Sequence, residues 1–131
     1  MAIVVDTNVV SYIFKKDTKS KFYEPQLTQV PKFISFMTFA ELRRWKIQSS
    51  WGKAKSAKFE ELLSSFGVIH SDGRLCEIWA ELTHDAQQKG KSISTSDAWI
   101  AAVALMFDIP LVTHNRRHFE NIRRLQIISE S

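Results

Sequence analysis

The chain has 131 residues, the length of one ordinary domain and too short for two separate hydrophobic cores. Apolar residues make up 44% of it and charged residues 24%, proportions that argue against a disordered chain. A single cysteine, Cys76, excludes an internal disulfide and a four-cysteine metal site, and no apolar stretch is long enough to cross a bilayer. We therefore expect one domain over residues 1–131, located in the reducing cytoplasm and without membrane contact.

Short apolar runs alternate with amphipathic stretches in the first half of the chain. Residues 3–5 are β-branched and lead into Asp6-Thr7-Asn8, a pattern typical of a strand followed by a helix start. Pro31 opens a second apolar run. We expect a first helix around Val9–Phe14, a strand at 32–36, helices over about 37–48 and 53–66, and a minimal strand at 68–69.

The second half continues this alternation. An apolar stripe from Leu75 to Ala86 predicts an amphipathic helix over 71–89, which Gly90 ends. Residues 94–96 can cap an apolar helix over 97–107. A third clear strand at 111–113, a short helix near 116–121 and an edge strand at 126–128 follow. The alternation predicts an α/β fold with a short, mainly parallel sheet of about four to five strands flanked by helices.

Four oxygen-bearing side chains follow or adjoin the expected strands: Asp6, Glu41, Asp97 and Asn115. Open α/β sheets bind ligands beyond the carboxyl ends of their strands, so these side chains can converge on one crevice. Clustered carboxylates repel one another unless a cation or protons neutralise them. Hard oxygen ligands favour Mg²⁺ or Mn²⁺ over zinc, and such ions support phosphodiester hydrolysis.

A structural interpretation accounts for each acid separately. Asp6 is a natural helix cap, and the segments 38–41 and 94–97 fit capping boxes or come close to them. An acid in the first turn of a helix also complements the helix dipole. Spacing alone leaves the structural and the catalytic interpretations equally open.

Four segments, in order, resemble the motifs of PIN-domain ribonucleases: Met1–Val9 with Asp6, Thr38–Arg43 with Glu41, Ser96–Ala102 with Asp97, and Leu111–Asn115. The resemblance covers essentially the whole chain and is strongest to the toxins of bacterial VapBC type II toxin–antitoxin systems. It implies a compact PIN-like α/β domain and Mg²⁺-dependent endoribonuclease activity on tRNA or rRNA, with Mn²⁺ able to substitute. It also implies a small cognate antitoxin, a homodimer, and a larger hetero-oligomer of toxin with antitoxin.

The resemblance assigns roles residue by residue. Asp6 and Asp97 correspond to the principal metal ligands, and Glu41 completes the acidic set directly or through water. Asn115 stands where many relatives carry an acid or Asn. The polar residues that position these acids in the family correspond to Thr7, Asn8 and Thr113.

One departure from the family pattern concerns His118, because relatives commonly carry Asp or Glu immediately before the residue matching Phe119. An imidazole is a poorer ligand for a hard cation than a carboxylate, so a one-metal site is favoured. His114 and His118 lack a third ligand for zinc. The candidates for RNA contact are Arg43, Arg44, Arg116, Arg117 and His118, although basic clusters are also common on solvated surfaces.

Two further hypotheses compete with a nuclease. A nuclease-dead PIN-like domain could act only as a binding module, in an antitoxin complex on operator DNA, and His118 favours this alternative. A phosphate-accepting receiver domain needs a lysine after a late strand, which residues 113–115 do not supply. For the homodimer, the surplus of large apolar residues between Phe33 and Trp51 suggests an interface there.

Overall fold

Five parallel strands form the centre of the computed structural model, which describes all 131 residues. Strand β1 (Ile3–Val5) lies in the middle of the sheet. On one side follow β2 (Lys32–Ser35) and β3 (Gly67–Ile69), and on the other β4 (Leu111–Val112) and β5 (Ile127–Ile128). The expected α/β class and parallel sheet are confirmed, and the carboxyl ends of all five strands point the same way.

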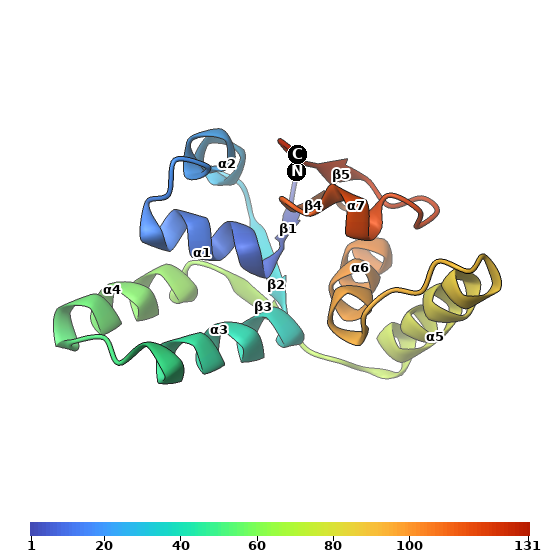
Figure 1. Ribbon diagram of the computed structural model, residues 1–131, viewed down its shortest axis with the longest axis horizontal. Coiled ribbons are helices and arrows are strands. Elements are labelled where there is room, and N and C mark those ends of the chain that lie inside the picture. Colours follow the sequence, from blue (N-terminus) through green and yellow to red (C-terminus); the bar gives the residue numbers. More distant parts are fainter.

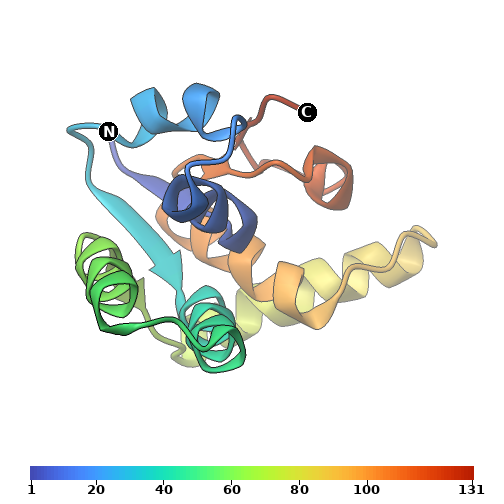
Figure 2. The ribbon, with the colours of Figure 1, turned by 60° about the vertical axis from the view of Figure 1, so that its left-hand side comes forward.

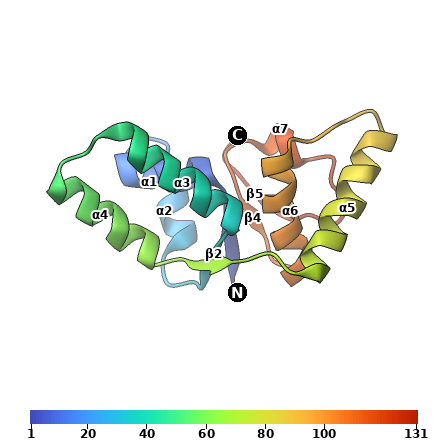
Figure 3. The ribbon, with the colours of Figure 1, turned by 90° about the horizontal axis from the view of Figure 1, so that it is seen from below.

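Seven helices surround the sheet: α1 (Thr7–Lys15), α2 (Ser20–Leu27), α3 (Phe36–Ser49), α4 (Lys53–Ser64), α5 (Gly73–Gln88), α6 (Thr95–Phe107) and α7 (Arg116–Phe119). They cover both of its faces (Figure 1 and Figure 2). Helices α1, α2 and α4 lie on one side, and α5 and α6 lie on the other. Seen from below, α3 and α6 are the inner helices, with α4 and α5 outside them (Figure 3).

The side chains of β1 point alternately into two hydrophobic clusters, one on each face of the sheet. Ile3 and Val5 face a cluster that includes Tyr23 and Phe59, whereas Val4 faces a second cluster that includes Phe119. Successive side chains on a strand point to opposite faces of the sheet, so a continuous apolar run is what a strand buried on both faces requires. All three residues of β1 are therefore buried, and Asp6 follows directly at the carboxyl end of this strand.

Helix α2 is the element that the sequence pattern did not predict. It contains Pro25 and has only a weakly amphipathic pattern, both of which obscure a helix in the sequence. Its buried residues Tyr23 and Leu27 pack into the core beside β1 and α1. Tertiary burial therefore stabilises a helix whose local sequence favours a loop.

Two glycines take positions that other residues would not tolerate as well, one after α5 and one at the start of β3. Helix α5 ends at Gln88, and Gly90 takes a left-handed φ of +68°, as its position in the sequence predicted. At the start of β3, a Cβ on Gly67 would lie 2.7 Å from Cδ1 of Phe33. Only glycine allows β2 and β3 to pair at this point with Phe33 in place.

Most of the large apolar side chains between Phe33 and Trp51 pack in or against the two core clusters. Trp45 and Trp51 pack edge-to-face with centroids 4.9 Å apart, and both contact Phe59. Both tryptophans are partly buried against the core, whereas Ile47 on the same segment is 80% exposed. The dimer interface expected between Phe33 and Trp51 stays a prediction. No helix has the length and apolar character needed to span a membrane.

Candidate active site

The four predicted site residues are brought together in one hollow of about 400 Å³ at the carboxyl end of the sheet. Asp6 follows β1, Glu41 lies on α3 after β2, Asp97 lies on α6, and Asn115 follows β4. The supporting residues Thr7 and Asn8 line the hollow as well. The remaining lining residues are Ser11, Lys15, Leu42, Trp45 and His118.

Asp6 is the most constrained of the acids, and its side chain is almost completely buried. Its Oδ1 accepts a hydrogen bond from the backbone N–H of Thr7 at 2.7 Å, which caps α1 as the structural interpretation predicted. Its Oδ2 accepts from Oγ1 of Thr113 at 2.7 Å, a contact between the ends of β1 and β4. Asp6 therefore caps a helix and also belongs to the polar cluster of the hollow.

Burial raises the pKa of Asp6 from 3.8 to about 6. Desolvation is the largest cause, and the negative charges of Asp97 and Glu41 add to it. The hydrogen bonds from Thr113 and Thr7 oppose this shift because they stabilise the carboxylate. Ionising a buried carboxyl group beside two other acids costs free energy, and a bound cation would offset part of that cost.

Glu41 is held by hydroxyl groups from two other elements. Oγ1 of Thr7 donates to Oε1 at 2.6 Å, and Oγ of Ser96 donates to Oε2 at 2.9 Å. These contacts join α1, α3 and α6, and both carboxylate oxygens are fixed. The expected capping role is absent, because Ser35 at the helix N-cap accepts instead from the N–H of Thr38.

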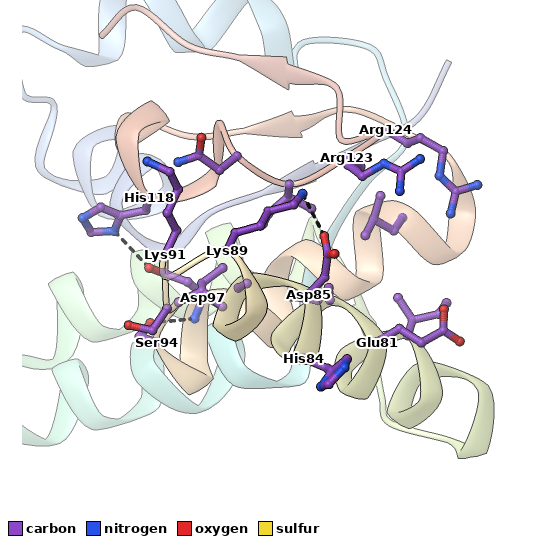
Figure 4. Close-up of a pocket in the computed structure, with 18 of the residues that line it drawn as sticks. Glu81, His84, Asp85, Lys89, Lys91, Ser94, Asp97, His118, Arg123 and Arg124 are labelled. Atoms are coloured by element: carbon purple, nitrogen blue, oxygen red, sulfur yellow. Dashed lines mark hydrogen bonds and ion pairs between the residues drawn. The ribbon is translucent and has the colours of Figure 1, made fainter.

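Asp97 contacts His118, which stands where relatives with the four motifs commonly carry an acid. Nδ1 of His118 lies 2.9 Å from Oδ2 of Asp97, and the two side chains are 54% and 20% exposed (Figure 4). The backbone N–H of Asp97 donates to Oγ of Ser94, so Ser94 caps α6. His118 thus stands at the mouth of the hollow, in contact with a proposed ligand.

Thr113 links the remaining residues of the site. Besides donating to Asp6, its Oγ1 accepts from the backbone N–H of Asn115 at 3.0 Å. Asn115 itself is exposed at the rim and makes no side-chain capping bond. Asn8 accepts the backbone N–H of His114 at 3.4 Å through its Oδ1. Of the three residues predicted to position the acids, Thr7 and Thr113 contact acids directly, whereas Asn8 contacts only the backbone of His114.

Some supporting residues were not found from the sequence. The buried hydroxyl of Tyr23 lies 2.7 Å from Nδ1 of His114 and donates to the carbonyl of Thr113 at 3.3 Å. It also accepts the backbone N–H of Glu130 at 3.1 Å. Tyr23 belongs to the unpredicted helix α2, so local patterns carried no signal for this support. Ser96 was part of a quoted motif, but only the fold brings it to Glu41.

Of the predicted RNA contacts, the two on α3 differ from those near α7. Arg43 forms an ion pair with Glu60, which Lys46 also contacts at 2.7 Å. These two cations lower the pKa of Glu60 to about 2. Arg44 is exposed and lies outside the hollow. Near α7, Arg117 is exposed, whereas the backbone N–H of Arg116 donates to Oγ of Ser131.

The donor set fits a hard divalent cation in its chemistry. Asp6, Glu41 and Asp97 offer oxygen atoms, and each carboxylate oxygen that accepts one hydrogen bond retains a second lone pair. No group of three acidic, histidine or cysteine side chains is close enough to enclose an ion by itself. An ion at this site would take one or two of the carboxylates and complete its coordination with water, as hard cations such as Mg²⁺ do in proteins.

Comparison with known proteins identifies the class to which this fold and site belong. Residues 3–125 match the PIN domain family, which covers nearly the whole chain, so the protein is a member of that family. The resemblance seen in the four motifs is thereby confirmed.

Within this class, the chain is similar to Ribonuclease VapC1 of Haemophilus influenzae (strain R2866), with 28% identity over 130 residues and 96% of each chain covered. Among solved structures it resembles VapBC2 from Rickettsia felis, bound to a DNA fragment from its promoter. That match has 26% identity, a TM-score of 0.86 and full coverage of both chains. VapBC-1 from nontypeable Haemophilus influenzae gives 26% identity and a TM-score of 0.82, with 98% of each chain covered.

Proposed function

We propose that the protein is a metal-dependent endoribonuclease and the toxin of a VapBC-type toxin–antitoxin pair. The observation that carries the proposal is the buried Asp6, whose pKa is raised to about 6 in a hollow shared with Glu41 and Asp97. A structural cap needs neither deep burial nor two other acids beside it. The similarity to proteins named Ribonuclease VapC supports the same reaction class.

Asp6 and Asp97 are the residues that would hold Mg²⁺ or Mn²⁺, with Glu41 bound directly or through water. When bound, such an ion lowers the pKa of a coordinated water and stabilises charge on the phosphoryl oxygens. Asn115, at the rim, adds a neutral oxygen to this set. His118 takes the place of a further acid, so the residues favour a site for one ion over a site for two.

The chain's own residues prepare the hollow for this chemistry. Thr113 and the N–H of Thr7 orient Asp6, while the hydroxyls of Thr7 and Ser96 orient Glu41. Acids fixed in advance lose little freedom when they act, which is the benefit of a preorganised site. Lys15, which lines the same hollow, supplies a positive charge for a substrate phosphate.

The proposed partners are an RNA substrate, of the tRNA or rRNA class, and a small cognate antitoxin. The antitoxin is supported by similar structures that are VapBC complexes, two of them at about 26% identity. As the family resemblance implies, we also propose a homodimer that assembles with antitoxin into a larger complex in the cytoplasm. A sedimentation measurement at micromolar concentration tests the dimer, and a monomer would contradict it.

The alternative is a nuclease-dead domain that acts only in an antitoxin complex on operator DNA. The DNA-bound VapBC2 structure shows that binding role for a similar pair. It does not favour an inactive site here, because Asp6, Glu41 and Asp97 are all present and share the hollow.

Incubating the purified protein with total RNA, with Mg²⁺ and with EDTA, tests the proposal. We expect new RNA ends, mapped by sequencing, only when Mg²⁺ is present. The Asp97→Asn variant should produce none. Identical RNA ends with and without EDTA, or ends that persist in the variant, would overturn the proposal, and no cleavage by the wild-type protein would favour the binding module.

A further inference from the structure

We propose that the substrate strand leaves the acidic hollow along a second groove, which binds RNA phosphates on one wall and the amino groups of unpaired bases on the other. This inference rests on the proposed function, because it extends the same site toward its substrate. It assigns a path and a base preference to the RNA, neither of which follows from the acids themselves.

The second groove is the larger of the two, with a volume of about 1090 Å³. It runs between α5 and the segment that follows α7, and residues 91–94 of the loop before α6 also line it. Asp97 and His118 line both this groove and the acidic hollow. A strand whose scissile phosphate lies at Asp97 therefore enters this groove at its next nucleotides.

One wall of the groove is basic. Lys91, Arg117, Arg123 and Arg124, which we call the basic wall, are all exposed, and none of them forms an ion pair within the chain. Figure 4 shows Lys91 near the Asp97–His118 pair, and Arg123 and Arg124 farther along the groove. Unpaired cations along a groove that adjoins the acidic hollow are suited to the phosphates of a nucleic-acid backbone.

Arg124 adopts a backbone conformation that arginine does not favour. Its φ is +66°, in the left-handed region where glycine is the usual residue. Glycine at this position would relieve the strain but would remove the guanidinium from the groove. Lys16, Gln29, Ser50 and Asp108 share this backbone region. The conformation of Arg124 therefore makes Arg124→Gly a substitution that removes the cation without straining the backbone.

The opposite wall, formed by α5, carries three carboxylates, with the exposed Arg74 at the first turn of the helix. Glu77 and Glu81 are four residues apart, so they lie on the same face of the helix, and both are exposed without an ion-pair partner. Farther along the same face, Asp85 is neutralised by Lys89 at 3.0 Å. We call Glu77 and Glu81 the acidic wall. Figure 4 shows Glu81 and Asp85 on the side of the groove opposite Arg123 and Arg124.

The two walls together match the two sides of a single nucleic-acid strand. Its phosphates are anionic, whereas cytosine, adenine and guanine carry amino groups that donate hydrogen bonds to carboxylates. Uracil has no amino group: a carbonyl oxygen, which a carboxylate repels, takes the position of the cytosine amino group. Its one donor on that edge, the N3–H, lies between two such carbonyl oxygens. An unstructured acidic polypeptide would meet the basic wall but would gain nothing from the acidic one. The groove therefore fits an unpaired RNA segment and disfavours uridine.

The first experiment measures binding to fluorescent oligo-C and oligo-U RNA of about 12 nucleotides, in EDTA so that no strand is cut. The double variant Arg123→Ala/Arg124→Gly should bind oligo-C about ten-fold more weakly at low salt. Its slope of log affinity against log salt should fall by about 1.4, or about 0.7 for each cation. The control variant Lys53→Ala/Lys58→Ala changes the charge equally on α4, outside the groove, and should bind like the wild-type protein.

The second experiment tests the acidic wall with the Glu77→Ala/Glu81→Ala variant. The wild-type protein should bind oligo-C several-fold more tightly than oligo-U, and the variant should bind the two with nearly equal affinity. A general loss of repulsion would instead strengthen both complexes and leave their ratio unchanged, which would overturn the base preference. Wild-type affinity of the Arg123/Arg124 variant for RNA, with weakened binding of poly-glutamate, would assign the groove to an acidic polypeptide and overturn the proposal.

Failure of this inference is separable from failure of the proposed function. If the wild-type protein cleaves RNA and the groove variants bind RNA as tightly as it does, only the groove assignment is wrong. If no protein cleaves RNA but the binding differences appear as expected, the groove is supported and the nuclease assignment is wrong. Arg124→Gly alone adds a check on folding, because it should bind RNA more weakly while its melting temperature is unchanged or higher.

Discussion

Thr113 donates a 2.7 Å hydrogen bond to Asp6 from a position 107 residues away in the chain. The bond connects the end of β4 to the end of β1, two strands that are neighbours in the sheet. The Thr113 hydroxyl is the only side-chain group that donates a hydrogen bond to the buried Asp6 carboxylate. This bond partly offsets the free energy lost when the carboxylate is removed from water. The burial that would favour a bound cation at Asp6 therefore lowers the stability of the metal-free protein.

We expect Asp6→Asn to reduce RNA cleavage by about 100-fold or more, because the variant lacks an anionic ligand. The same variant should be more stable than the wild-type protein in metal-free buffer at pH 8. The folded pKa of about 6 exceeds the ordinary value of 3.8, so the folded state binds the proton more tightly. Wild-type stability consequently falls as pH rises from about 4 to about 6, by up to about 3 kcal/mol.

Thermal melts at pH 4.5 and pH 8, with and without Mg²⁺, test this prediction. The stability gain of Asp6→Asn should be larger at pH 8, and Mg²⁺ should stabilise only the wild-type protein. Asp72→Asn is the matched control, since Asp72 caps α5 outside the hollow and Asn caps equally well. An equal gain at both pH values would contradict the account of Asp6.

Thr113→Val should destabilise the protein by about 1–3 kcal/mol, because it removes the hydroxyl that serves Asp6 and Asn115. The hydrogen bond favours the ionised carboxylate, so its loss raises the pKa of Asp6 further. The destabilisation should thus be greater at pH 8 than at pH 4.5. Thr113→Ser retains the hydroxyl and should recover most of the stability, and urea denaturation of the three proteins measures these differences.

Ser96→Ala should raise the Mg²⁺ concentration needed for half-maximal cleavage several-fold. Ser96 holds one oxygen of Glu41 in place, whereas the cap of α6 depends on Ser94 and should be retained. The melting temperature should therefore change little. Thr83→Ala removes a hydroxyl that bonds only to backbone carbonyls within α5, and it should alter neither quantity. An unchanged Mg²⁺ requirement in Ser96→Ala would show that Glu41 does not need this orientation.

His118→Asp should lower the Mg²⁺ concentration for half-maximal cleavage, because a second carboxylate beside Asp97 strengthens the site for a hard cation. In metal-free buffer the two like charges should lower the melting temperature, and Mg²⁺ should reverse that loss. His118→Asn, which removes the imidazole without adding charge, separates the two effects. Should His118→Asp show the wild-type Mg²⁺ response in both cleavage and melting, His118 does not influence the metal site.

Local sequence patterns were sufficient to predict every helix and strand except α2, and to name the acids that share the hollow. The continuous apolar run Ile3–Val5 can be satisfied only by a strand buried on both faces, and Asp6 must then stand at its carboxyl end. The capping pattern before Asp97 likewise predicted the start of α6. These features depend on neighbours within about four residues, so local spacing is sufficient to find them.

The groups that act on those acids could be found only from the folded arrangement of the chain. The pairing of Asp97 with His118, the hold of Ser96 on Glu41 and the support of His114 by Tyr23 all join residues distant in the chain. Such contacts depend on the order of the strands in the sheet, because that order determines which loops meet at its edge. The raised pKa of Asp6 has the same origin, since desolvation comes from packing by the whole fold and not from the residues next to it in the chain.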